Sequence, residues 1–166
     1  RHFTQAEDLS ELQMIEVVDT LENFATWSMQ PFELLKRLDA ILVEREVELK
    51  YTGNVVLWIS ATRSLASMGY WDAQWPLKAL ELSRDKMFAD KVSFFQQCWL
   101  MESLAKLNLR DTVAYTNLAE LLLSEVRLFK DIKDVAPVAW AAASMSFQHA
   151  ELLDALYVRV MEMFEA

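Results

Sequence analysis

Apolar side chains recur at helical spacing along almost the whole chain. Ile59, Thr62, Leu65 and Ala66, for example, fall on one face of a helix that has 3.6 residues per turn. The same spacing returns in segment after segment. It predicts helices over residues 9–27, 32–48, 55–68, 73–89, 94–107, 112–130, 135–145 and 151–164.

A short motif returns four times, at the end of every second predicted helix. Its copies begin 41, 39 and 38 residues apart, at Phe24, Leu65, Leu104 and Ala142. In each copy the second residue is small, which allows two helices to approach closely. The fifth residue is of a type that commonly ends a helix. The small residues are Ala25, Ala66, Ala105 and Ala143. The helix-ending residues are Ser28, Gly69, Asn108 and Ser146.

Helices that alternate with these turns form helical hairpins. We predict an all-α fold, an α-solenoid of about four antiparallel helical hairpins with a period of about 38–41 residues. A single domain then spans residues 1–166, with units at 8–50, 51–92, 93–132 and 133–166. The first and last units depart from the motif as capping repeats do, and this favours a complete array.

Helix-start signals follow the turns. Asp72 and Asp111 are expected to cap the helices that come after them, because a carboxylate accepts hydrogen bonds from unpaired backbone N–H groups. Pro31, Pro76 and Pro137 are expected in first turns, where the missing N–H group has no helical partner to lose.

The composition agrees with a helical fold that has a substantial core. Hydrophobic residues make up 54% of the chain, while only 2 glycines and 3 prolines are available for β-turns. No apolar run reaches the roughly 20 residues that a transmembrane helix needs, so membrane insertion is not expected. The single cysteine, Cys98, is flanked by Gln97 and Trp99, and we expect it to pack in the core.

The third copy of the motif supports a family resemblance. Its residues Leu104-Ala-Lys-Leu-Asn-Leu-Arg-Asp111, with Leu118-Ala-Glu-Leu-Leu122, resemble the repeat of the octotricopeptide and heptatricopeptide families, relatives of pentatricopeptide proteins. The likeness covers most of the chain and is best in the second and third units. Pro31 and His149 stand where the family has Asp, which weakens any base-by-base RNA code.

The resemblance implies two functions. Repeats of these families act in mitochondria or chloroplasts, where most bind organellar RNA and some serve as structural subunits. In size and repeat type the chain also resembles the tricopeptide-like class of accessory subunit on the catalytic head of euglenozoan mitochondrial ATP synthase. The implied location is the mitochondrial matrix side, after removal of a transit peptide, which agrees with a sequence that begins at Arg1.

Charge favours the structural function. The chain has 16 basic and 25 acidic residues, a net charge of −9, whereas proteins that bind through phosphate contacts carry a basic face. We therefore expect a scaffold subunit that docks onto protein subunits of a large mitochondrial assembly, the ATP synthase head first and the mitochondrial ribosome next. The alternative is an organellar RNA-binding factor with a basic strip at Arg63, Lys106 and Arg110.

Two groups of residues are candidates for contact with a protein partner. Trp71 and Trp75 lie near a hairpin turn, where full burial is difficult, and aromatic anchors often dominate interfaces. Acidic residues of the first helix would either face a basic protein surface or form a solvated helix face. The candidates among them are Glu11, Asp19 and Glu22.

Motifs for catalysis or for cofactor binding are not found. The histidines are His2 and His149, which do not have the spacing of a metal-binding motif. Gly53 and Gly69 cannot form a glycine-rich phosphate loop. We therefore expect no enzyme activity, no catalytic residues, no metal site and no cofactor.

Overall fold

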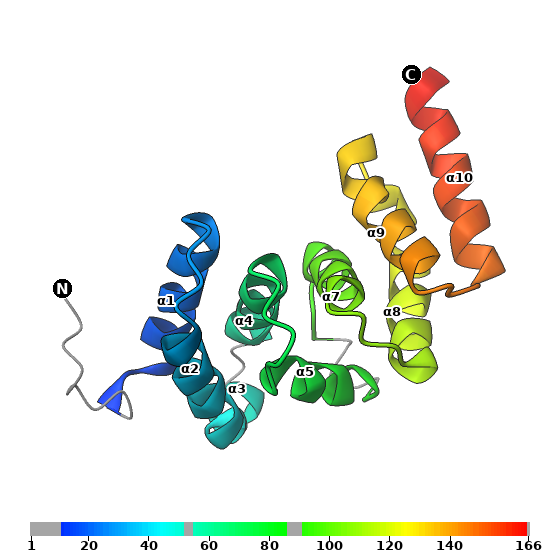
Figure 1. The fold of residues 1–166 in the computed structure, drawn as a ribbon. Coiled ribbons are helices and arrows are strands. Elements are labelled where there is room, and N and C mark those ends of the chain that lie inside the picture. Colours follow the sequence, from blue (N-terminus) through cyan, green and yellow to red (C-terminus); the bar gives the residue numbers. More distant parts are fainter. Residues whose placement is uncertain (1–10, 52–54, 86–90, 166) are drawn as a thin grey trace.

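The computed structural model describes residues 11–51, 55–85 and 91–165, which form a curved row of packed helices (Figure 1). No strand occurs in these ranges, and the predicted all-α class is confirmed. The helices are α1 (Met14–Thr26), α2 (Phe32–Glu44), α3 (Glu46–Tyr51), α4 (Val55–Ser67), α5 (Trp75–Ser83), α7 (Phe94–Lys106), α8 (Thr112–Ser124), the short 3₁₀ helix η2 (Val126–Leu128), α9 (Ile132–Ser144) and α10 (Ala150–Glu165).

The helices are arranged in two layers. In the first layer α1 packs on α4, α4 on α7, and α7 on α9. In the second layer α2 packs on α5, α5 on α8, and α8 on α10 (Figure 1). The two helices of each unit also contact each other, so the fold is the predicted α-solenoid of four helical hairpins.

The same hydrogen-bonded turn follows the first helix of all four hairpins. The second residue after each first-layer helix has a left-handed backbone, and its N–H group bonds to the carbonyl of the residue three positions earlier. The next N–H group bonds to the carbonyl five positions earlier, which completes a Schellman motif. The predicted helix-ending residues are confirmed, with φ of 53° at Ser28, 64° at Gly69, 54° at Asn108 and 54° at Ser146.

Several predicted helix bounds are wrong. α1 begins at Met14 rather than residue 9, although residues 9 and 10 lie outside the described residues. α2 ends at Glu44, and α3 follows as a separate helix. α5 ends at Ser83, and the predicted end at residue 89 lies outside the described residues.

The prediction for Pro137 is also wrong. α9 begins at Ile132, because the Asp131 side chain caps it by accepting a 3.0 Å hydrogen bond from Lys133 N. Pro137 therefore lies inside the helix rather than in its first turn. Pro31 and Pro76 do lie at the starts of α2 and α5, as expected.

The core fills the space between neighbouring helices of both layers. Its largest fully buried side chains include Trp58, Trp75, Tyr115 and Phe129. Cys98 is also buried, as expected, and burial raises the pKa of its thiol to about 12. The thiol is therefore protonated at neutral pH and contributes to the fold as a small apolar side chain.

A buried carboxylate joins the first hairpin to the second. Asp39 of α2 is only 5% exposed, and its two oxygens accept 2.8 Å hydrogen bonds from Gln74 N and Trp75 N. These N–H groups start α5 and have no partner within that helix. Burial raises the pKa of the Asp39 carboxyl, and the two backbone hydrogen bonds oppose part of this shift.

The prediction that Asp72 caps α5 is therefore wrong. Asp39 of the preceding hairpin accepts the hydrogen bonds at the start of α5, and Asp72 is exposed. The expected cap at Asp111 is confirmed. Its Oδ1 atom accepts a 2.8 Å hydrogen bond from Ala114 N at the start of α8, and its Oδ2 atom pairs with Arg84 at the end of α5.

Replacement of Asp39 tests this link between hairpins. We expect Asp39→Ala to lower the free energy of unfolding by about 1–3 kcal/mol, because two buried N–H groups lose their acceptor. Urea denaturation followed by circular dichroism measures the loss. Asp72→Ala, at the exposed neighbouring carboxylate, is the control and should change stability by less than about 0.5 kcal/mol. Equal losses in the two variants would contradict the capping role of Asp39.

Candidate interaction surface

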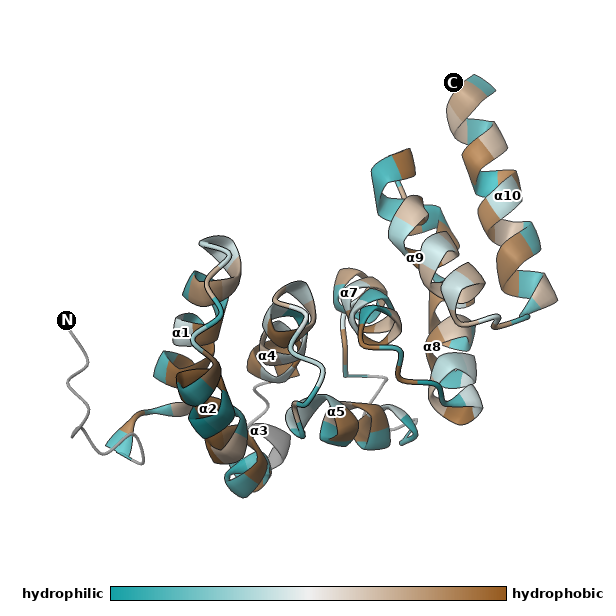
Figure 2. Cartoon of the chain, in the orientation of Figure 1, coloured by the Kyte–Doolittle hydropathy of each residue, from teal (hydrophilic) through white to brown (hydrophobic). Residues whose placement is uncertain are grey.

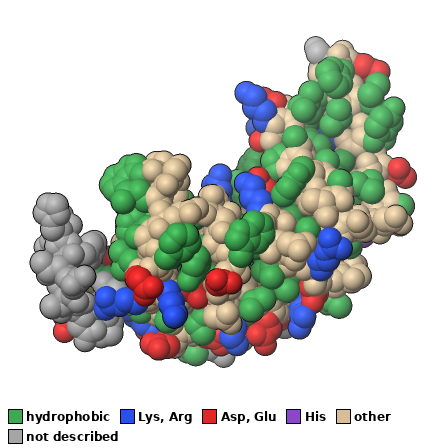
Figure 3. Space-filling model, viewed as in Figure 1, with side chains coloured by type: hydrophobic (Ala, Val, Ile, Leu, Met, Phe, Trp, Pro, Cys, Tyr) green, Lys and Arg blue, Asp and Glu red, His purple; other side chains and the backbone are tan. Residues whose placement is uncertain are grey.

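The turns of the first two hairpins carry a group of exposed apolar side chains. Trp27 is 65% exposed and Trp71 is 64% exposed, although aromatic side chains of this size are usually mostly buried. Figure 3 shows hydrophobic side chains gathered over the end of α1 where the chain turns into α2. We call this group the turn patch, and it consists of the exposed Trp27, Met29, Phe32 and Trp71 together with the half-buried Tyr70 that lies near Phe32.

The backbone of the two turns holds the turn patch in place. The Gln30 side chain donates a hydrogen bond to the Met68 carbonyl, so the first turn is tied to the second. The Phe32 and Tyr70 rings lie 6.5 Å apart across the same junction. At Gly69 an added Cβ would lie 3.6 Å from Trp71 Nε1, which shows that the indole folds back over its own turn.

Trp75 does not belong to this surface, and the prediction that it is exposed beside Trp71 is wrong. Its side chain is fully buried, and its indole N–H donates to the Trp58 carbonyl at 3.4 Å. Because Asp39 holds the backbone of Trp75 from the preceding hairpin, the first turn of α5 points inward. Trp27, which we did not select from the sequence, is as exposed as Trp71.

The three acidic candidates are exposed, as a contact with a partner requires. Asp19 and Glu22 are three residues apart on α1 and therefore share one face of that helix, while Glu11 precedes the helix. Glu22 also lines a groove of about 360 Å³ between α1 and α4. Arg63, a candidate of opposite charge, lines the same groove, so this surface is of mixed charge rather than basic.

The three basic candidates lie on different elements. Arg63 of α4 places its guanidinium carbon 4.4 Å from the centroid of the Trp99 ring in α7. Lys106, at the end of α7, pairs with Glu102 at 2.7 Å. Arg110 is exposed in the turn that follows. Its Nε atom donates a 3.3 Å hydrogen bond to Asn108 Oδ1, so all three basic side chains are already in contact with groups of the same chain.

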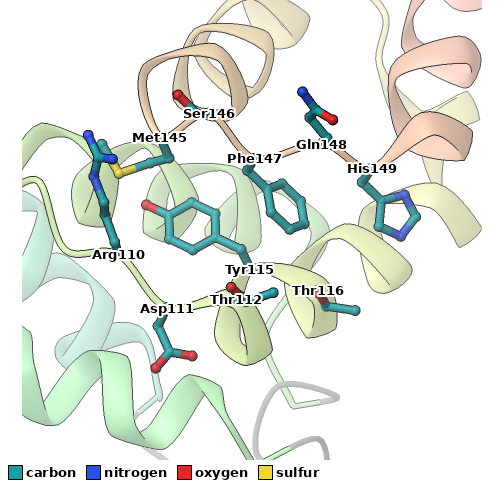
Figure 4. Close-up of a pocket in the computed structure, with 10 residues that line it drawn as sticks. All are labelled: Arg110, Asp111, Thr112, Tyr115, Thr116, Met145, Ser146, Phe147, Gln148 and His149. Carbon is teal, nitrogen blue, oxygen red and sulfur yellow. The ribbon is translucent and has the colours of Figure 1, made fainter.

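A cavity of about 250 Å³ lies between the third and fourth turns, and sequence analysis did not find it. Figure 4 shows the Tyr115 and Phe147 rings beside each other within it, and their centroids are 5.6 Å apart. His149 Nδ1 accepts a 3.2 Å hydrogen bond from Leu152 N and so caps α10, as Asp111 caps α8. The further lining residues are Arg110, Thr112, Thr116, Met145, Ser146 and Gln148.

Tyr115 is the unusual member of this cavity. Its side chain is 1% exposed, and its hydroxyl has no hydrogen-bond partner among the described residues. Burial raises the pKa of this phenol well above its ordinary value, so the hydroxyl stays protonated. A buried hydroxyl without a partner lowers the stability of the fold, and the packing of the Tyr115 ring has to compensate this cost.

Comparison with family models, with curated proteins and with solved structures found no match for this chain. Within the described ranges, no group of three or more His, Cys, Asp or Glu side chains is placed to hold a metal ion. None of the described helices is both long and apolar enough to cross a membrane.

Removal of the Tyr115 hydroxyl tests this description of the cavity. We expect Tyr115→Phe to leave the free energy of unfolding unchanged or to raise it by up to about 1 kcal/mol, because the ring remains and an unpaired polar atom is lost. Thermal and urea unfolding measure the change, with Tyr157→Phe at an exposed tyrosine as the control. A loss of more than about 1 kcal/mol in Tyr115→Phe would mean that the hydroxyl has a stabilising partner.

Proposed function

We propose that this chain is a non-catalytic scaffold subunit that binds a protein partner through the turn patch. The observation that carries the proposal is the pair of tryptophans, Trp27 and Trp71, each about two-thirds exposed on turns that contact each other. Tryptophan is enriched among the residues that dominate protein interfaces. An exposed apolar patch of this kind is typical of a binding site.

The rigidity of the turn patch supports the same proposal. Each turn is fixed by two backbone hydrogen bonds at a left-handed residue, Ser28 in the first and Gly69 in the second. The Gln30 side chain adds a bond between the turns. A partner therefore meets a turn backbone that is already ordered, and less conformational entropy is lost on binding.

The repeat resemblance and the net charge support a particular setting for this subunit. The tricopeptide-like repeat favours a large mitochondrial assembly, with the catalytic head of ATP synthase first and the mitochondrial ribosome next. The net charge of −9 favours a protein partner over nucleic acid. Exposed carboxylates at Asp19 and Glu22 would meet basic side chains at the edge of such an interface.

RNA binding is the alternative function. It is favoured by Arg110, an exposed guanidinium beside the cavity of the third and fourth turns. The contacts of Arg63 with Trp99 and of Lys106 with Glu102 reduce the positive charge available to phosphates. The experiment below separates the two functions.

The proposed function is tested by native purification from a mitochondrial extract. Tagged wild-type protein is compared with the double variant Trp27→Ala, Trp71→Ala, and each extract is divided into a nuclease-treated half and an untreated half. We expect one protein assembly to be recovered at fixed stoichiometry from both wild-type halves. We expect the double variant to lose it by about tenfold or more, because two aromatic anchors are removed.

The control is the double variant Val56→Ala, Val113→Ala, which removes two exposed apolar side chains that are outside the turn patch. It should recover the assembly as well as wild type. Loss of the partners on nuclease treatment would instead support RNA binding. Equal recovery by the tryptophan variant and wild type would exclude the turn patch as the contact.

A further inference from the structure

Three contacts show which positions of a hairpin face the hairpin that follows it. Asp39 caps the first turn of α5 in the second unit. The Arg63 guanidinium of the second unit lies over the Trp99 ring of the third. The Tyr115 ring of the third unit lies beside Phe147 in the turn of the fourth, with centroids 5.6 Å apart.

The repeat spacing identifies the residues of the fourth hairpin that occupy these positions. The copies of the motif begin 41, 39 and 38 residues apart, so adding these steps to a residue number gives its counterpart in a later hairpin. In the fourth hairpin, Tyr157 is the counterpart of Asp39, Trp140 of Arg63 and Leu153 of Tyr115. Asp39 and Tyr115 are buried against the next hairpin, at 5% and 1% exposure. Their counterparts are exposed, Tyr157 at 66% and Leu153 at 39%, and Trp140 is 47% exposed.

These residues belong to two exposed stripes on the fourth hairpin. On α9, Ala136, Trp140 and Ala143 are separated by four and three residues and lie on one side of the helix. The counterparts of the two alanines in α7 are Cys98 and Ala105, which are buried. Small residues at these positions allow another helix to approach closely.

The stripe on α10 is larger. Leu153, Tyr157 and Phe164 are separated by four and seven residues, so they also lie on one side of their helix. Hydrophobic segments are visible along α10 in Figure 2. We call the two stripes together the stacking face, and it consists of Ala136, Trp140, Ala143, Leu153, Tyr157 and Phe164.

Acidic side chains border the stacking face. Asp154 follows Leu153 and Glu165 follows Phe164, so both carboxylates lie along one edge of the α10 stripe, and both are exposed. Figure 3 shows acidic side chains together with hydrophobic ones on the surface that α10 forms. Arg159 does not offset this charge, because its guanidinium binds the Phe129 carbonyl and pairs with Glu162 at 2.8 Å.

We infer that the stacking face binds an amphipathic α-helix of a partner protein, with an apolar stripe and basic residues along its edge. The apolar stripe would pack on α9 and α10 as the next hairpin packs in units one to three. Lys or Arg side chains would meet Asp154 and Glu165. This surface is separate from the turn patch, and the inference does not depend on the proposed function.

The charge distribution disfavours a second copy of this chain as the occupant. Pairing of two stacking faces would bring the acidic edges of two α10 helices together. Stacking on the first hairpin of another copy would place them near residues 1–50, a segment that has 5 basic and 11 acidic residues. Like charges that face each other across an interface oppose association.

Two synthetic peptides of about 18 residues test the inference, a length at which isolated helices begin to form in water. Both carry the same leucine and alanine stripe, one bordered by lysine and the other by glutamate, and binding is measured by fluorescence anisotropy. We expect the lysine peptide to bind at least about tenfold more tightly than the glutamate peptide. Salt should weaken this preference.

Variants of the chain locate the binding. Tyr157→Ser, Phe164→Ser should weaken binding of the lysine peptide by about tenfold or more, and Asp154→Lys, Glu165→Lys should reverse the preference between peptides. Val56→Ser, Val113→Ser, which alters exposed apolar residues elsewhere, should bind as wild type does. All the changed side chains are exposed, and circular dichroism melts check that each variant is folded.

Four results would overturn the inference. The first is equal binding of the two peptides, and the second is binding that the Tyr157→Ser, Phe164→Ser variant leaves unchanged. The third is a wild-type dimer, detected by light scattering, that this variant converts to monomer, because the stacking face would then belong to a second copy. A monomeric wild-type chain that binds neither peptide would also reject the proposed partner chemistry.

Discussion

The left-handed residue that ends each first-layer helix is the constraint on which the rest of the structure depends. Helices of L-residues commonly end where one residue adopts positive φ, and here that residue recurs at Ser28, Gly69, Asn108 and Ser146. Because the same two backbone hydrogen bonds close all four turns, the second helix of every unit starts in the same direction. Similar hairpins can then stack in series. Only one of the four residues is glycine, so the other three accept an unfavourable backbone conformation that the bonded carbonyls and the packed helices compensate.

Stacking requires contacts between hairpins as well as within them, and polar groups supply part of these. Asp39 caps a helix of the second hairpin, Arg84 pairs with Asp111 of the third, and Arg159 binds the carbonyl of Phe129. In each case a side chain satisfies a backbone or charged group at a helix end, where partners within the helix are missing. The cap from Asp39 has a second consequence. It fixes the start of α5 so that Trp75 enters the core, while Trp71, in the turn before it, stays on the surface.

The elements that depend on local sequence could be predicted, and those that depend on contacts between units could not. Helical periodicity and the four turn residues predicted the hairpins, because a Schellman turn is encoded within about six residues. The burial of Trp75 depends on Asp39, 36 residues earlier, and nothing near Trp75 distinguishes it from Trp71. The start of α9 was missed because the apolar stripe begins at Val135, while the capping Asp131 lies one turn before it. Of the turn patch, only Trp71 was predicted, for the same reason, since its residues come from two turns that meet only in the fold.

A solenoid repeats its contacts, and this makes its exposed surfaces easier to interpret than those of an irregular fold. Each hairpin has one side that receives the preceding hairpin and one side that receives the next, so a position can be compared with its counterparts. Along α1, the exposed side includes the charged residue Asp19, as expected for a helix that faces water, whereas Glu22 lines the groove toward α4. On α9 and α10, four positions that are buried in the third hairpin remain apolar and exposed, and they are Ala136, Ala143, Leu153 and Tyr157. The two ends of the described stack therefore differ in chemistry, and a partner helix with basic edges would satisfy both the apolar stripes and the acidic residues beside them.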